Sequence, residues 1–171
     1  MALLHGLVPD VDPMKELIGA YLESQYGWLS RSTFLALGCA LTAVALAVRA
    51  HRAGGVLPRV AAILLLLGVL GLVGVASAPA GVRYFAIPAQ PATVLSILML
   101  SIVLRRDPRW RPIGNVLVLI GGALVAVFLL TVVLGTLVAL GVGGLANRLV
   151  LILIYVWVAL VARGLLMRTR C

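Results

Sequence analysis

Long apolar runs separated by short polar links dominate the sequence. Each run has about twenty residues, the length with which a helix crosses roughly 30 Å of hydrocarbon. In lipid a helix satisfies its backbone groups within one segment, and these runs are too long and too uniform for barrel strands. The pattern predicts an all-α bundle with five transmembrane helices, at about residues 29–50, 60–78, 84–104, 113–140 and 149–167.

A short amphipathic segment precedes the first run. Asp12 followed by Pro13 is typical of a helix start, because the carboxylate accepts hydrogen bonds from the first turn and proline is preset for it. Apolar residues then recur at helical spacing, at Met14, Leu17, Ile18, Tyr21 and Leu22. We therefore expect a surface helix over residues 13–25, on the outer membrane face or on the bundle. Residues 1–28 would form this outer segment, and residues 29–171 the bundle.

Composition supports the membrane class. Of the 171 residues 63% are hydrophobic and 11% are charged, and a soluble domain of this size could not bury so much apolar surface. The formal net charge of +9 does not indicate nucleic acid, because the basic residues form short clusters between the apolar runs rather than one patch. Such clusters are typical of links that meet anionic lipid headgroups, so membrane lipids are expected partners.

The positive charges predict an orientation. Links on one side carry ten basic residues, and those on the other side carry four. The first set is Arg49, Arg52, Arg59, Arg105, Arg106, Arg109, Arg111, Arg163, Arg168 and Arg170, and the second is Lys15, Arg31, Arg83 and Arg148. Because Lys and Arg in short loops mark the cytoplasmic face, we expect an inner-membrane protein with its N-terminus outside and its C-terminus in the cytoplasm.

Two groups of residues are candidate contact surfaces. The outer segment holds four of the five carboxylates and two aromatic residues suited to the headgroup level. The second run has glycines at a spacing of three, which favours close helix approach, either within this bundle or against a partner's helix. The candidates are Asp10, Asp12, Glu16, Glu23, Tyr26, Trp28, Gly68, Gly71 and Gly74.

The sequence predicts no catalytic, cofactor or metal site. Ionisable residues are absent from the middle of every predicted span, which argues against proton-coupled transport. His5 and His51 lie in a tail and a link, where they cannot ligate a buried cofactor. Ser30, Ser32 and Thr33 lie near Glu23, but no histidine accompanies them as a base. The protein is therefore not expected to be an enzyme.

Proline and glycine residues predict local backbone features at two further places in the sequence. Pro88 and Pro91 predict an irregular or kinked first turn in the third span, with a broken helix lining a cavity as the alternative. The glycines of residues 141–144 predict a tight turn, after which Asn147 can cap the last helix.

The stretch "PDVDPMKELIGAYLESQYGWLSRSTFLALG" resembles a bacterial family of polytopic membrane proteins of unknown function, family no. 998. Family members share a "P-D-x-D-P…S-x-Y…Y-G-W" segment before a membrane helix, and the matching residues here are Pro9, Asp10, Asp12, Pro13, Tyr21, Tyr26, Gly27 and Trp28. An arginine after a short glycine turn, Arg148, is also similar. Two features differ: the family has one more helix upstream, and its "F-P-x-D…G-x-x-H" set is missing. The resemblance implies fold and topology but no activity.

Two functions fit these observations. One is an accessory or structural subunit of a larger inner-membrane complex, in contact with other membrane protein subunits. The alternative is a protein that binds or transports lipid or another apolar small molecule, with the kinked third span forming a cleft.

Overall fold

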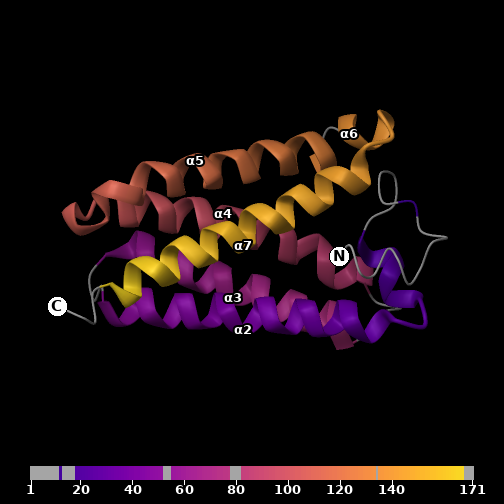
Figure 1. The fold of residues 1–171 in the computed structure, drawn as a ribbon, viewed down its shortest axis with the longest axis horizontal. Helices are drawn as coiled ribbons and strands as arrows, with labels where there is room; N and C mark the ends of the chain where they lie inside the picture. The colour runs from indigo at the N-terminus through magenta and orange to yellow at the C-terminus, as the bar shows by residue number, and fades with distance from the viewer. Residues whose placement is uncertain (1–11, 13–17, 52–54, 78–81, 134, 168–171) are drawn as a thin grey trace.

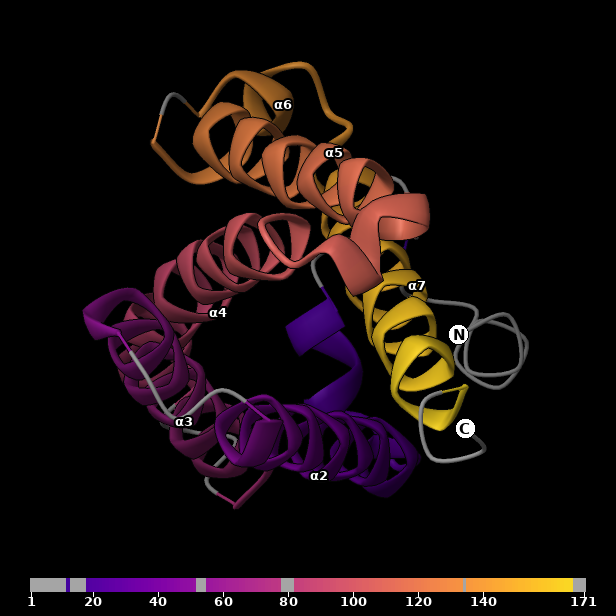
Figure 2. The same ribbon diagram turned by 90° about the vertical axis from the view of Figure 1, so that its left-hand side faces the viewer.

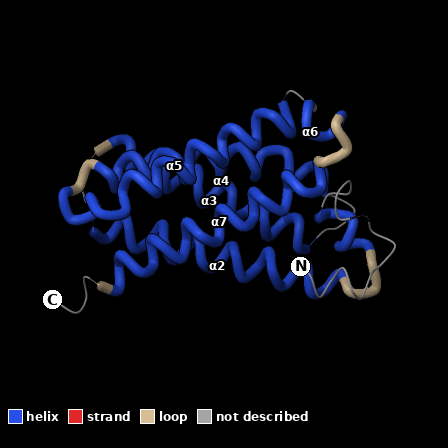
Figure 3. The backbone as a smooth tube through the Cα atoms, turned by 45° about the horizontal axis from the view of Figure 1, so that its top comes forward, coloured by secondary structure: helices blue, strands red, loops and turns tan. Residues whose placement is uncertain are grey.

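Helices form the whole of the described architecture. The computed structural model describes residues 12, 18–51, 55–77, 82–133 and 135–167, and the regular structure in this part of the chain is helical. Five long helices lie side by side (Figure 1): α2 (Gly27–His51), α3 (Val56–Ser77), α4 (Val82–Arg105), α5 (Arg111–Phe128) and α7 (Gly143–Leu166). Seen along their axes they form a ring in that order (Figure 2), and the connecting turns lie at the two ends (Figure 3).

The helices have the length and apolarity of membrane spans. Within the described residues, four segments are long and apolar enough to cross a bilayer: Gly27–Ala50, Val56–Ser77, Pro108–Thr131 and Gly143–Leu166. Helix α4 has 24 residues, but its apolar part, Ala89–Arg105, is shorter than a span. The helical membrane class is confirmed, whereas a fifth span through α4 stays a prediction.

A continuous apolar core occupies the inside of the ring. Each long helix contributes fully buried side chains, for example Leu41 of α2, Leu65 of α3, Leu100 of α4, Leu117 of α5 and Trp157 of α7. One buried polar contact crosses this core, because the Trp157 indole Nε1 donates to Ser101 Oγ over 2.8 Å. The same Ser101 hydroxyl donates to the Ile97 carbonyl at 2.7 Å, so both buried polar groups are satisfied and α7 is tied to α4.

Gly68 of α3 lies at the contact between α3 and α4. A Cβ atom on Gly68 would stand 3.2 Å from both Cβ and N of Thr93, and would overlap Thr93 Oγ1. Gly71 is also buried, and Gly74 is half-buried. Gly68 therefore serves the packing of this chain's own helices, since small residues let two backbones approach closely where lipid supplies no hydrophobic drive for association.

The prediction of one continuous fourth span over residues 113–140 was wrong. Helix α5 ends at Phe128, a π-helical turn follows over Leu129–Val133 (η4), and the short α6 is Thr136–Ala139. Thr131 Oγ1 donates to the Val127 carbonyl at 2.7 Å, a contact that commonly bends helices. Gly135 then has a φ of +62°, a left-handed conformation that stops a helix.

One further local expectation failed, and the alternative of a broken helix in the third span is excluded. Helix α7 begins at Gly143 after an N-cap at Val142 without a side-chain hydrogen bond, so Asn147 lies inside the helix and is not its cap. The predicted turn is confined to its first residues, where Gly141 has a φ of +73°. Helix α4 passes through Pro88 and Pro91 without interruption, so the third span does not begin as a broken helix.

The first prediction concerns the contact between α3 and α4. Gly68→Leu should lower the stability of the purified protein by about 1–3 kcal/mol, because the new side chain must displace Thr93. The matched control is Gly122→Leu, since a Cβ there meets no atom within 4 Å. Thermal unfolding in mild detergent measures both variants, and equal melting temperatures for them would contradict the packing assigned to Gly68.

Candidate functional site

One end of the bundle is closed by a short folded segment, which we call the end cap (residues 18–28). Its first part is η1, a six-residue 3-10 helix over Ile18–Glu23 that packs on α2 and α7 (Figures 1 and 2). The predicted surface helix therefore ends at Glu23 rather than at residue 25, and its residues 13–17 lie outside the described residues. The segment lies on the bundle, which is one of the two positions expected for it.

One aromatic and one aliphatic side chain hold the end cap in place. Tyr21 and Leu22, both assigned to the apolar face of the segment, are each 1% exposed. Glu23, which is not one of the residues at that apolar spacing, is exposed. The helical spacing of apolar residues thus indicated the buried side correctly for the part of the segment that the structure describes.

The turn between η1 and α2 depends on Gly27. A Cβ atom there would lie 2.9 Å from the Leu22 carbonyl carbon and would overlap the Leu22 oxygen. The backbone of η1 therefore folds back onto the first turn of α2 at a distance that only glycine permits. Hydrogen bonds from Gly27 N to Ser24 O (2.9 Å) and from Leu29 N to Tyr26 O (3.0 Å) complete the turn.

Arg148 connects the end cap to the last helix. Its Nη2 donates to the Tyr21 hydroxyl at 3.1 Å and its Nη1 to the Gly144 carbonyl at 2.9 Å. Its guanidinium carbon also stands 5.7 Å from the centre of the Tyr21 ring, within the range of a cation–π interaction. The half-buried Arg148 thus contacts a residue that lies 127 positions away in the sequence.

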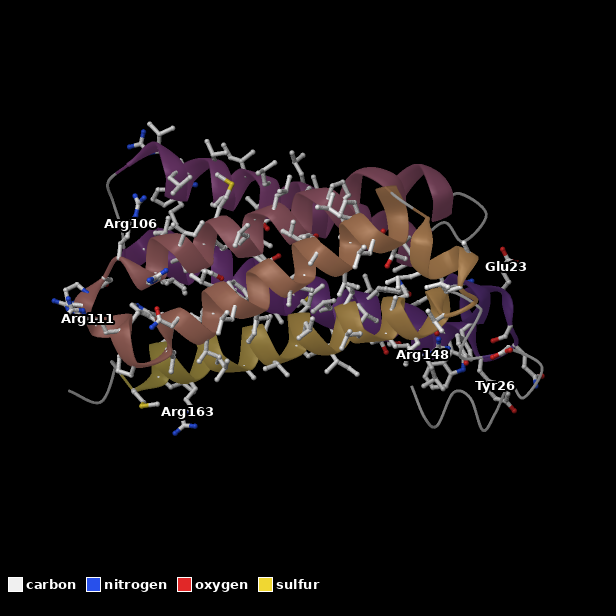
Figure 4. All side chains as sticks on the ribbon, turned by 90° about the horizontal axis from the view of Figure 1, so that it is seen from above. Glu23, Tyr26, Arg106, Arg111, Arg148 and Arg163 are labelled. Carbon is white, nitrogen blue, oxygen red and sulfur yellow. The ribbon has the colours of Figure 1, made fainter. Side chains whose placement is uncertain are left out.

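The remaining candidates of this end differ in their exposure. Trp28 is 61% exposed, Tyr26 is half-buried, and Asp12 is half-buried. Figure 4 shows Glu23, Tyr26 and Arg148 together at this end of the bundle. Asp10 and Glu16 lie outside the described residues.

The opposite end of the bundle is rich in exposed arginine. Figure 4 shows Arg106, Arg111 and Arg163 there, far from the end cap. Among the described residues, the exposed arginines of this end lie at helix ends or in the α4–α5 link, and they are Arg49, Arg59, Arg105, Arg106, Arg109, Arg111 and Arg163. The two ends of the molecule therefore differ sharply in charge.

Two of the three candidate hydroxyl groups near the end cap are hydrogen-bonded to their own helix, whereas the buried Ser30 Oγ has no hydrogen-bond partner in the structure. Ser32 Oγ donates to the Trp28 carbonyl at 2.8 Å and Thr33 Oγ1 to the Leu29 carbonyl at 2.9 Å. Ser30 is fully buried. Over the described ranges, no group of three or more His, Cys, Asp and Glu side chains could hold a metal ion.

Sequence reasoning missed the pairing of Tyr21 with Arg148. Each residue carried a signal, since Tyr21 belonged to the predicted apolar face and Arg148 followed a glycine turn at the start of a span. Nothing in a single sequence indicates that residues so far apart in the chain meet. Trp110 was missed as well, although it is the one aromatic residue of the arginine-rich link.

The fold and its two contrasting ends define a polytopic helical membrane protein. A family model described as "Protein of unknown function (DUF998)" matches residues 1–164, and the chain belongs to this family, as its outer segment suggested. No curated protein and no solved structure matches the chain.

The second prediction tests the hold of Arg148 on the end cap. Arg148→Gln removes the hydrogen bond to Tyr21 and the cation–π contact, and hydrogen bonds to charged groups contribute about 1.5–3 kcal/mol. Because Arg148 is only half-buried, we expect a local loss of about 1–2 kcal/mol, or roughly 5–30-fold faster amide exchange. Hydrogen–deuterium exchange at Gly27 and Leu29 measures it.

Tyr21→Phe should give a smaller increase, because the ring contact survives while the hydroxyl is lost. The internal control is the amide of Asp107 at the opposite end, which donates to Leu104 O at 3.0 Å and should exchange at its normal rate. Unchanged exchange at Gly27 in both variants would show that the cap is held by Tyr21 and Leu22 burial alone.

Proposed function

We propose that this protein is an accessory or structural subunit of a larger inner-membrane complex, acting by contact and performing no reaction of its own. In this proposal all five long helices span the membrane, with α4 as the third span. The end cap faces outward as the docking surface for another membrane protein subunit.

The observation that carries the proposal is the anchoring of the end cap. Tyr21, Leu22 and Arg148 fix the segment to two helices, while Trp28 and Glu23 stand exposed on it. A large aromatic side chain held on a rigid support loses little freedom when it binds, and Trp is enriched among residues that dominate interfaces. The end cap thus has the properties of a preorganised contact surface.

The charge difference between the ends supports the proposed orientation. Seven described arginines are exposed at the end opposite the end cap, whereas Arg31 and Arg148 at the end-cap end are half-buried. An excess of exposed Lys and Arg marks the cytoplasmic side. The end cap would therefore face away from the cytoplasm, and the last residues of α7 would face it.

The third prediction tests this orientation. Cys39 and Cys171 are replaced by alanine, and single cysteines are introduced as Gln25→Cys in the end cap or Arg109→Cys in the opposite end. A membrane-impermeant maleimide added to spheroplasts should label position 25, and should label position 109 only after the membrane is opened. Labelling of position 109 in intact spheroplasts would reverse the proposed topology.

The fourth prediction tests the docking surface. Trp28→Ala combined with Glu23→Gln should reduce partner retention at least about tenfold, since truncation of an interface hot spot costs 2 kcal/mol or more. The control is Leu140→Ala, which trims another exposed side chain in the α6–α7 turn. Native gels and mass spectrometry of material purified in mild detergent give the readout.

The subunit proposal fails if the combined Trp28→Ala/Glu23→Gln variant keeps every partner, as the Leu140→Ala control should. It also fails if the wild-type protein runs only as a lone monomer. Binding of lipid or another apolar small molecule then becomes the preferred function, and the same mass spectra would show such a molecule retained with the monomer.

A further inference from the structure

The arginine-rich link between α4 and α5 has a hydrogen-bonded backbone conformation. Its middle is η3, a 3-10 turn over Pro108–Trp110 whose N-cap Asp107 accepts a hydrogen bond from Arg109 N at 3.0 Å. Trp110 N donates to Asp107 O at 2.9 Å. These contacts fix the backbone on which the arginines stand.

Trp110 anchors this link to the last helix. Its side chain is 2% exposed, and its ring covers Gly164 of α7 so closely that a Cβ there would lie 2.7 Å from Cη2. The residue before Gly164 is Arg163, and the residues on either side of Trp110 are Arg109 and Arg111. The three exposed arginines therefore flank one buried contact, and we call this group the Trp110 ledge (Arg109, Trp110, Arg111 and Arg163).

Apolar surface begins directly beside the Trp110 ledge. On α5, which begins at this end, the exposed residues Val116 and Leu119 follow Arg111 toward the middle of the bundle. On α7, which ends here, the exposed residues Val156 and Ile152 precede Arg163 by about two and three turns on the same face. Guanidinium groups therefore border apolar helix surface on two elements. A ligand that matches this arrangement carries an anionic head and apolar chains.

We propose that the Trp110 ledge is a binding site for the phosphate headgroup of an anionic phospholipid, whose acyl chains lie on the exposed apolar sides of α5 and α7. Arginine suits this ligand because its planar fork donates two hydrogen bonds to one phosphate. Basic sites between membrane helices on the cytoplasmic side bind such headgroups. This inference is independent of the proposed docking at the end cap, because it concerns the opposite end of the molecule.

The test uses the full chain, purified in mild detergent and freed of lipid. Phosphatidylglycerol, or phosphatidylcholine with the same acyl chains, is titrated while native mass spectrometry measures the bound fraction. The wild-type protein should bind phosphatidylglycerol more tightly. Because a basic residue that contacts an anionic headgroup contributes about 1 kcal/mol, or roughly a factor of five, Arg109→Gln/Arg111→Gln/Arg163→Gln should weaken that binding at least about tenfold.

The matched control removes charge from the same end without touching the Trp110 ledge. Arg49→Gln/Arg59→Gln changes two exposed arginines of α2 and α3, and it should leave phosphatidylglycerol affinity within about twofold of wild type. Circular dichroism confirms that each variant remains helical.

Three results would overturn the proposal. Comparable losses per arginine in the triple variant and in the control would mean that the whole end attracts anions without a site. Equal binding of the two lipids by the wild-type protein would mean that the protein does not recognise the negative charge of the headgroup. Competition by inorganic phosphate at the same concentration as the lipid would mean that the ledge takes a free anion instead of a lipid.

Discussion

Backbone hydrogen bonding in lipid is the constraint on which the rest of this structure depends. Hydrocarbon offers no partner to an N–H or C=O group, so each spanning segment must be helical. Lipid also gives no hydrophobic drive for the helices to associate, so they must be held by close contact. Gly68 against Thr93 and Gly164 against Trp110 supply such contacts, each at a separation that a side chain on the glycine would not allow. Gly121 lies close to Leu98 as well, because a Cβ there would stand 3.0 Å from Leu98 Cα.

Polar contacts then fix the last helix within the ring. The hydrogen bond between Trp157 and Ser101 lies in the buried core, and the contact between Arg148 and Tyr21 lies at the end-cap end. Both place a polar side chain of α7 against an element distant in sequence. Since a buried donor that loses its acceptor is costly, these contacts favour one position of α7 over others that would pack the same apolar surface.

The two ends of the bundle are suited to different partners. At one end the side chains that anchor the cap leave a tryptophan exposed, which suits contact with another protein. At the other end Trp110 is buried and leaves arginines exposed, which suits phosphate headgroups. In each case one aromatic residue holds a short 3-10 segment against α7, so α7 carries both the proposed protein contact and the proposed lipid contact.

The amino-acid sequence by itself determined the class, the positions of the helices and the unequal charge of the two ends, because helix length and charge placement are set by the bilayer and are local along the chain. It also indicated Tyr21 and Leu22 as buried, since a face of a helix can be recognised from spacing. Only the tertiary structure decided that the run after Ile113 is interrupted at Gly135 and that Asn147 is no cap. Those outcomes depend on backbone conformation at Gly135 and Gly141, which composition does not encode. The pairs Tyr21–Arg148, Trp157–Ser101 and Trp110–Gly164 likewise required the fold, because each joins residues whose separation in sequence carries no sign of their contact.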